Sequence, residues 1–422
     1  MSRLLPALVL LVTVVLAACS LPVPRLGPSV VIGAIYPLSG PQSEGGHEEL
    51  GGVQAALQLA RQQGVAGLDG MELQIEDVRT PDEARAAVDR LIDRYHAPLI
   101  IGTYGSTLSA VAAARADERH VVYWETGAVA DQVTASRKYV FRTVATGSTL
   151  GRIAVAFTRQ VLLGGAGLAP AAARVAIVGV DDVYGASVAD AEEAGAREAG
   201  IQVVGRIRYS PYAYSASAIA DELAAARPDF LWDVSYLDDG IAIWRAVLDR
   251  RIPLRAAIGT SSAFCMDDFG RTLGAQAVGL YAADKPAGTV PAGALSPAAA
   301  ALLVKARAAY HSVTGDGGMP IPAVAGFVGG WVLFHDVLPG LDGKVTSERV
   351  GTAAFALDIP AGSEINGGGV KFSPLGSPDA GQNLRTAAVV GQWQAVNQMK
   401  IVYPAPYAES APRLELSAPR FG

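Results

Sequence analysis

The chain has 422 residues, of which 50% are hydrophobic and 18% are charged, and its formal net charge is −6. This length exceeds one ordinary core and predicts two domains, and the composition predicts a well-buried globular protein. Lysine and arginine do not form a block anywhere in the chain, so nucleic acid is not expected as a partner.

The first segment has the features of an export signal. Arg3 precedes an apolar run over residues 4–15, and small residues lead to Cys19. The run is shorter than the roughly 20 residues that a membrane-spanning helix needs. The pattern resembles a bacterial lipoprotein signal, and an ordinary signal peptide is the alternative. We expect a signal peptide over residues 1–18 and an exported protein, anchored to the outer face of the cell membrane through lipid on Cys19.

A proline-rich tether is predicted at residues 19–29, where three prolines stiffen the chain between the anchor and the body. If Cys19 carries lipid, Cys265 has no partner and no intramolecular disulfide can form. We therefore expect Cys265 to be a buried small side chain and the fold to rest on its apolar core.

Beyond the tether, short apolar runs alternate with helical segments. Strands are predicted at residues 30–35, 71–75, 99–101, 120–124, 174–179, 201–206, 230–234 and 254–259. Helices are predicted at residues 48–62, 81–94, 106–116, 150–161, 187–199, 216–226, 240–248, 297–311 and 323–338. This alternation predicts an α/β fold with two doubly wound parallel sheets. Residues 361–383 are predicted to be irregular, and residues 405–422 a loose C-terminal tail.

Ligands of doubly wound sheets bind beyond the carboxyl ends of the strands, which singles out three segments. In residues 102–107, a helix starting at Ser106 could present free N–H groups to a carboxylate or phosphate, or could simply be capped. Glu125 could pair with an ammonium group, or be a solvated or locally paired carboxylate. Tyr184 could cover a ligand with its ring, with Asp182 capping the next helix, or could pack at the sheet edge.

Signals for catalysis are missing from the sequence. The five histidines are widely separated, and neither a nucleophile turn nor a P-loop occurs. The glycine-rich residues 164–167 follow a helix, which is the wrong context for dinucleotide binding. We expect a binding protein with no enzymatic activity, no cofactor and no metal.

The chain resembles the branched-chain amino-acid (Leu/Ile/Val) substrate-binding family of ABC transporters, the type I periplasmic binding proteins. The resemblance covers roughly residues 30–400 and is carried by short motifs at residues 35–40, 50–52, 67–70, 101–106, 125–128, 140–143, 183–185 and 278–280. It implies two lobes joined by a three-strand hinge, with the ligand between them. Residues 30–145 and 285–357 would form one lobe, and residues 146–284 and 358–404 the other.

Two loops of the first lobe match the family's contacts to the ligand carboxylate. Ser106 stands where the family's serine binds that carboxylate, with Tyr104 and Gly105 beside it. Gly127 and Ala128 lie in the second loop that contacts the carboxylate. The resemblance therefore implies that these residues bind ligand.

The second lobe matches the family less completely. Tyr184 lies where an aromatic residue closes over the ligand, and Tyr236 lies near a further contact. Ser261 stands where the amino-acid binders place a carboxylate for the ligand ammonium, and a neutral serine cannot supply that charge-assisted bond of roughly 1.5–3 kcal/mol. Either Glu125 or Asp233 takes this role, or the ligand is not an α-amino acid.

The expected function is that of a monomeric solute-binding lipoprotein that serves the permease and ATPase of an ABC importer. Its ligand is expected to be an amino acid or a related small polar solute, such as an amide, a urea-like compound or a carboxylate. The alternative is a ligand sensor of the same fold that signals to a regulator without transport.

Overall fold

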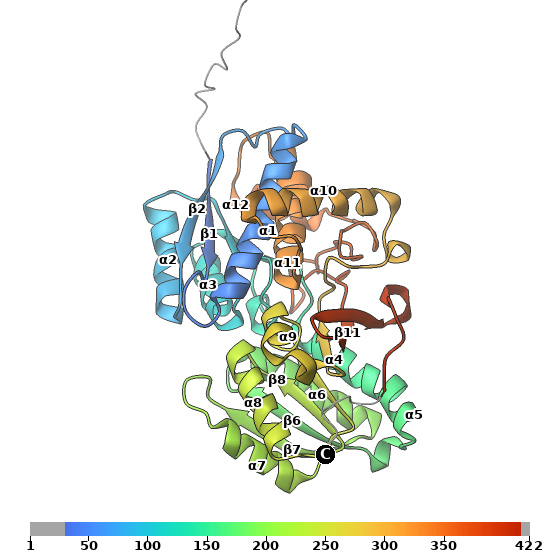
Figure 1. The fold of residues 1–422 in the computed structure, drawn as a ribbon. Coiled ribbons are helices and arrows are strands. Elements are labelled where there is room, and N and C mark those ends of the chain that lie inside the picture. The colour runs from blue at the N-terminus through green and yellow to red at the C-terminus, as the bar shows by residue number, and fades with distance from the viewer. Residues whose placement is uncertain (1–29, 415–422) are drawn as a thin grey trace, which may run out of the picture.

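A computed structural model describes residues 30–414, which form two lobes, each built on its own sheet (Figure 1). The predicted signal peptide, Cys19 and the tether lie outside the described residues.

The first lobe is built on a five-stranded parallel sheet with the strand order β2-β1-β3-β4-β5. Its strands are β1 (Val30–Tyr36), β2 (Met71–Asp77), β3 (Leu99–Gly102), β4 (Val122–Glu125) and β5 (Val140–Arg142). The central strands β3 and β4 are buried along their whole length, as short continuous apolar runs predict.

Six helices belong to the first lobe: α1 (Ser43–Gln62), α2 (Pro81–Asp93), α3 (Ser106–Glu118), α10 (Pro297–Thr314), α11 (Ile321–Trp331) and α12 (Ser347–Phe355). α1 starts five residues before its predicted start. Glycine is a poor helix former, yet α1 needs it here: a Cβ on Gly46 would lie 1.9 Å from the carbonyl oxygen of Pro37. The described residues contain one helical stretch apolar enough to cross a membrane, Ile321–Leu341, but 89% of its apolar window is buried, so it is a core helix.

The second lobe has a seven-stranded sheet with the order β12-β11-β10-β9-β8-β6-β7. Its strands are β6 (Arg174–Val180), β7 (Gln202–Tyr209), β8 (Phe230–Val234), β9 (Ala256–Thr260), β10 (Tyr281–Asp284), β11 (Val389–Ala395) and β12 (Gln398–Tyr403). β11 runs antiparallel to both β10 and β12, so this sheet is mixed rather than wholly parallel.

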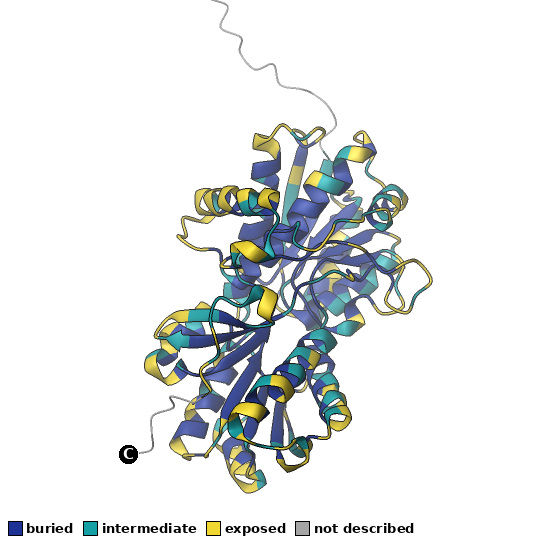
Figure 2. Cartoon of the chain, turned by 90° about the vertical axis from the view of Figure 1, so that its right-hand side faces the viewer, coloured by how far each residue is buried: buried dark blue, intermediate teal, exposed yellow. Residues whose placement is uncertain are grey.

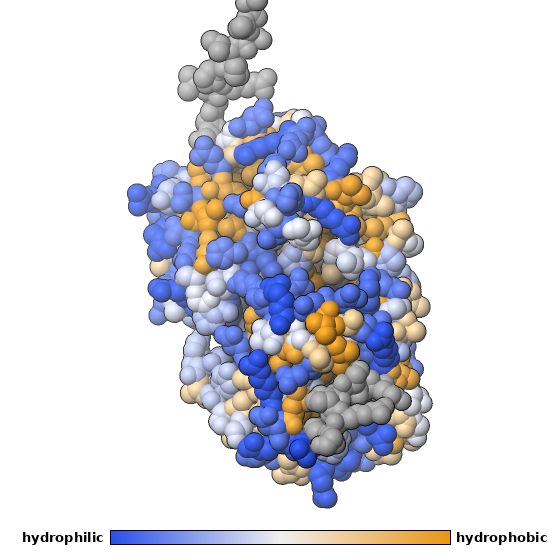
Figure 3. All heavy atoms as spheres, in the orientation of Figure 1, coloured by the Kyte–Doolittle hydropathy of each residue, from blue (hydrophilic) through white to orange (hydrophobic). Residues whose placement is uncertain are grey.

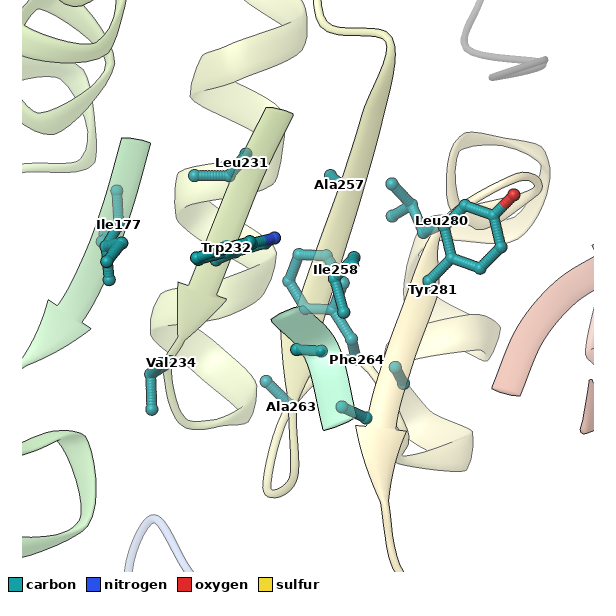
Figure 4. Packing of buried hydrophobic residues seen from close by; sticks show 14 of the residues in the cluster. Ile177, Leu231, Trp232, Val234, Ala257, Ile258, Ala263, Phe264, Leu280 and Tyr281 are labelled. Atoms are coloured by element: carbon teal, nitrogen blue, oxygen red, sulfur yellow. The ribbon is translucent and has the colours of Figure 1, made fainter. Parts of the chain in front are cut away.

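Helices cover the second sheet on both faces, and the strands between them are the most deeply buried part of the lobe (Figure 2). The helices of this lobe are α4 (Gly147–Phe157), α5 (Leu163–Ala166), α6 (Val183–Ala199), α7 (Ala216–Ala226), α8 (Leu237–Asp249) and α9 (Asp267–Leu273). Trp232, Ile258, Phe264 and Tyr281 pack together in the core of this lobe (Figure 4).

The chain passes between the lobes three times, after β5, after β10 and before β11. The last crossing comes later than the predicted boundary at residue 358. Ile365, Val370 and Phe372 join the core of the first lobe, where the Phe372 ring lies 5.5 Å from that of Trp124. The predicted assignment of this segment to the second lobe is therefore corrected, because its apolar side chains pack beside β4.

The predicted loose tail is held in place over its described part, residues 405–414. The carbonyl oxygen of Arg413 accepts hydrogen bonds from the Tyr281 hydroxyl at 2.6 Å and from Gln392 Nε2 at 2.7 Å. The prediction of a loose tail is therefore wrong for these residues, and residues 415–422 lie outside the described part.

Candidate functional site

The loops at the carboxyl ends of the two sheets face each other and touch. Thr107 Oγ1, on α3 of the first lobe, donates a hydrogen bond to Asp182 Oδ2 of the second lobe at 3.2 Å. The Tyr104 hydroxyl lies 3.7 Å from Met266 Sδ. On the face shown in Figure 3, hydrophilic residues lie beside a hydrophobic patch along the junction of the lobes. These contacts locate the candidate site between the lobes, at the strand ends that the sequence predicted.

Ser106 lies at the first position of α3 and is 4% exposed. Its Oγ accepts hydrogen bonds from the backbone N–H groups of Val129 at 3.2 Å and Ala130 at 3.1 Å. The hydroxyl therefore holds the loop after β4 in place. A serine hydroxyl that accepts two bonds still has a proton to donate, which suits an acceptor such as a carboxylate.

Tyr104 fills the centre of the space between the lobes. Its ring lies so close to α1 that a Cβ on Gly45 would be 2.3 Å from Tyr104 Cζ. A cavity of about 10 Å³ remains where Tyr104 meets Tyr236 and Met266. Gly105, the next residue, lies against Gln42, since a Cβ there would be 2.1 Å from Gln42 Oε1.

Glu125 is fully buried at the end of β4 and is surrounded by donors. One carboxylate oxygen accepts from the N–H groups of Gly127 and Ala128, both at 2.7 Å. The other accepts from the Thr103 N–H at 3.1 Å and from the Ser109 hydroxyl. Burial raises the pKa of Glu125 to about 7, and these donors limit the rise. Its lone pairs are thus used within the first lobe.

Asp233, the second candidate for an ammonium partner, lies in β8 and is 0% exposed. Neither carboxylate oxygen has a hydrogen-bond partner among the described residues. Burial raises its pKa to about 8. Asp233 lies apart from the inter-lobe contacts, within the second lobe.

Tyr184 and Tyr236 lie side by side on the second lobe, with ring centroids 5.3 Å apart. The buried Tyr184 hydroxyl donates to the carbonyl oxygen of Thr260. The Tyr236 hydroxyl donates to Asp182 Oδ2 at 2.6 Å, and the other oxygen of Asp182 accepts from the Gly185 N–H at 2.9 Å, capping α6. Both tyrosines lie on the second-lobe side of the inter-lobe contact, and their role in binding ligand stays a prediction.

Lys285 was not predicted from the sequence, and it lies beside Ser261. Its buried Nζ is 3.5 Å from Ser261 Oγ, 3.4 Å from the carbonyl oxygen of Gly127 and 3.2 Å from Asp284 Oδ1. The position at which the resemblance to the amino-acid binders implies a carboxylate thus holds a serine with a paired lysine. The short apolar run before Asp284 could have indicated a strand that leads to Lys285. That strand is β10, which is four residues long and was not predicted.

Gly127 lies in direct contact with another buried acid. A Cβ at this position would be 1.6 Å from Glu49 Oε2, so a larger residue would have to displace the Glu49 carboxylate. Glu49 is 0% exposed and accepts from Thr126 Oγ1 at 2.6 Å. Burial, and then the charge of Glu125, raise the pKa of Glu49. The loop that follows β4 is therefore tightly built against α1.

Two larger cavities lie beside this contact, and both lobes line each of them. One, of about 310 Å³, lies between residues 37–42 and 79–81 of the first lobe and residues 211–214 and 236–239 of the second. The other, of about 530 Å³, lies beside the β11–β12 hairpin and includes Lys285. Both volumes fall in the range of small-molecule sites. Among residues 30–414, groups of three or more side chains suited to holding a metal ion are absent.

Two α/β lobes with facing strand ends, three chain crossings and a lined space between the lobes define the class of type I periplasmic binding proteins. Comparison with known proteins agrees with this class. The model of a family described as periplasmic binding protein matches residues 29–390, so the chain belongs to this family. The family resemblance predicted from the sequence is confirmed.

Similarity to named proteins and to solved structures covers nearly the whole chain. Leu/Ile/Val-binding protein homolog 8 of Brucella abortus is 28% identical over 379 residues, which are 89% of this chain and 90% of that protein. A leucine-binding protein from Thermotoga maritima has a TM-score of 0.73 at 19% identity, covering 88% of this chain and 97% of that one. A solute-binding protein of an ABC transporter from R. palustris, crystallised with benzoate, has a TM-score of 0.74 at 17% identity, covering 92% and 99%.

Proposed function

We propose that this chain is an exported, lipid-anchored binding protein that captures one small polar solute between its lobes and delivers it to an ABC importer without altering it. The observation that supports this most directly is the inter-lobe contact of Thr107 with Asp182, beside a cavity that both lobes line. Membership of the periplasmic-binding-protein family supports the extracytoplasmic location. The solute is an amino acid or a related small polar compound, and the protein acts as a monomer.

The proposed cycle couples solute binding to closure of the lobes. In the open form Tyr104 separates from Met266 and admits the solute to the space beside Ser106, Tyr184 and Tyr236. A solute that contacts both lobes favours closure only by its greater affinity for the closed form. The buried loops after β3 and β4 are already held by internal hydrogen bonds, so they reorganise little on binding.

A binding experiment on the full chain tests the central step. Isothermal titration calorimetry with a panel of amino acids, amides and small carboxylates should find one solute that binds with a 1:1 stoichiometry, and chromatography should recover it unchanged. Chemical conversion of any bound solute would contradict a binding role and indicate an enzyme.

Two further measurements test the anchor and the delivery. A Cys19→Ser variant should move the protein from the membrane fraction to the soluble extracytoplasmic fraction. Deletion of the gene should abolish high-affinity uptake of the bound solute. Unchanged uptake together with a lost transcriptional response would favour the sensor of the same fold instead.

A further inference from the structure

The cavity of about 310 Å³ has a distinctive second-lobe wall. Tyrosines and aspartates make up most of it: Asp182, Tyr212, Tyr214, Tyr236, Asp238 and Asp239. The first lobe adds three prolines and Leu108 on the opposite side. The cavity therefore combines aromatic and apolar surface with carboxylates on one wall.

The charge of this cavity is negative. Arg79 is the one basic residue that lines it among the described residues, and it is already paired, since its guanidinium lies 2.9 Å from Glu83 Oε1. Asp77, next to the first-lobe wall, accepts hydrogen bonds from the Leu38 N–H and the Ser39 hydroxyl and adds a further carboxylate. A solute anion would therefore meet carboxylates without a free basic partner.

The two second-lobe helix N-termini that face the cavity are occupied by the chain's own carboxylates. Free N–H groups at a helix start are the usual backbone site for an anion. Here Asp182 caps α6, and Asp238 and Asp239 lie in the first turn of α8. On the second-lobe side, the chain's own carboxylates thus stand where an anionic solute would otherwise bind. On the first-lobe side, Asp182 also lies against the start of α3, where it accepts a hydrogen bond from Thr107.

Acceptors in the cavity remain available for a solute that donates hydrogen bonds. The Asp238 side chain is exposed and makes no hydrogen bond or ion pair with any residue from 30 to 414. Tyr212, 88% exposed, presents its ring at the edge of the cavity, and the faces of such rings attract cations.

We propose that this cavity binds a small organic cation, an amine or quaternary ammonium with an apolar body, through Asp182 and Asp238 and the tyrosine rings. This proposal rests on the proposed function and narrows its solute class; the cavity adjoins the contact of Tyr104 with Met266 at Tyr236, which lines both. The ammonium group lies against the carboxylates, and the body contacts the tyrosines and prolines. A benzoate-like anion, the ligand of one structural relative, is excluded by the charge of the wall.

Two sets of compounds test whether the cavity prefers cations, by calorimetry on the full chain. Within each set the apolar part is the same and only the charged groups differ. One set is leucine, leucine without its carboxylate (isoamylamine) and leucine without its amine (4-methylpentanoate). The other is phenylalanine, phenethylamine and 3-phenylpropionate. Within each set the amine should bind at least 10-fold more tightly than the acid, and raised salt should weaken it.

Variants test whether the carboxylates of the second-lobe wall cause the tighter binding of amines. Asp238→Asn and Asp182→Asn should each weaken amine binding about 10-fold, and asparagine can still cap α6. Asp181→Asn is the control, because Asp181 is exposed and pairs with Arg208 outside the cavity; it should bind amine as the unmodified chain does.

The outcomes separate this inference from the function on which it rests. If an acid or a zwitterion binds more tightly than its matched amine, or if Asp238→Asn binds amine unchanged, the cation proposal is overturned and solute binding stands. If neither these probes nor the wider solute panel binds, the cation proposal and the proposed function fail together.

Discussion

Glu125 shows how a side chain that suggests ligand binding can instead shape the site. It follows a buried strand and has the charge that an ammonium group needs, which is why the sequence made it a candidate. In the structure its oxygens accept from three backbone N–H groups and from Ser109. The sequence could not reveal this, because the donors come from two loops that only the folded sheet brings together.

The first prediction concerns this carboxylate. Glu125→Gln replaces one oxygen with an NH₂ group that faces backbone donors, so it leaves buried N–H groups unpaired. The free energy of unfolding should fall by about 2–3 kcal/mol, as measured by urea denaturation. Glu118→Gln, at an exposed salt bridge in the same lobe, should change it by less than about 1 kcal/mol. Unchanged stability together with lost solute binding would instead make Glu125 a ligand contact.

Gly127 supports a second prediction at the same scale. A methyl group here would lie 1.6 Å from Glu49 Oε2, so Gly127→Ala must displace the buried Glu49 carboxylate, which is bonded to Thr126, or shift the loop. We expect a loss of about 1–3 kcal/mol in the free energy of unfolding. Gly164→Ala is the matched control, because nothing lies within 4 Å of its added methyl and the position is helical. That variant should match or slightly exceed the unmodified chain, and equal stability of the two variants would contradict the packing described.

At the scale of the element, strands were predictable where burial is two-sided and continuous. Apolar runs located β1, β3, β6, β8 and β9 to within a few residues. β5 and β10 were not predicted: β5 is only 3 residues long, and β10 (YAAD) lacks the aliphatic run of the equally short β3 (LIIG). β11 and β12 are interrupted by Gln392, Gln394 and Lys400, and they form a hairpin whose pairing depends on β10. These two strands can be predicted only once the strand that β11 pairs with is known.

Helices α1 and α9 bring acidic side chains of the two lobes together, which leads to a pH prediction. Glu44 and Glu48 on α1 lie near Asp267 and Asp268, and Arg271 pairs with Glu44 at 3.4 Å. Burial and these neighbouring charges raise the pKa of Glu48 to about 9, from an ordinary 4.5. Between those values the unfolded chain releases a proton that the folded chain keeps, so stability falls as pH rises.

A variant separates the contribution of Glu48 to the pH dependence of stability from that of other acids. Glu48→Gln should flatten the decrease in unfolding free energy between pH 5 and pH 9 by up to about 1.4 kcal/mol per pH unit, since one proton is involved. Urea denaturation at several pH values measures it. Glu72→Gln, on the exposed side of β2, should keep the slope of the unmodified chain. A Glu48→Gln slope equal to that of the unmodified chain would show that Glu48 is ionised in the folded protein.

For the whole molecule, the sequence predicted the family, the two lobes and the edges at which they meet. The two sheets and their carboxyl edges follow from the alternation of strands and helices, whereas the family was predicted from the resemblance of short motifs. The contacts that join the lobes were not predictable, since Thr107 and Asp182 are 75 residues apart. The same holds for residues 361–383, whose composition predicts irregular structure but not that Phe372 packs against the first sheet.

Lys285 is the side chain through which the fold as a whole can be tested, because it lies where the chain crosses between the lobes. Its Nζ contacts the Gly127 carbonyl of the first lobe and Ser261 of the second, and it pairs with Asp284 at 3.2 Å. Burial lowers the pKa of Lys285, but the nearby charges, Asp284 foremost, raise it more, so the amine stays charged. Removal of this cation leaves a buried carboxylate unpaired.

Lys285→Met should therefore lower the free energy of unfolding by about 3–5 kcal/mol. It should also loosen the two lobes, which small-angle X-ray scattering would record as a larger radius of gyration. The double variant Asp284→Asn, Lys285→Met removes the unpaired charge and should recover much of the stability but not the compact arrangement, because the contacts to Gly127 and Ser261 stay lost. If the double variant is as compact as the unmodified chain, Lys285 balances a buried charge and does not hold the lobes together.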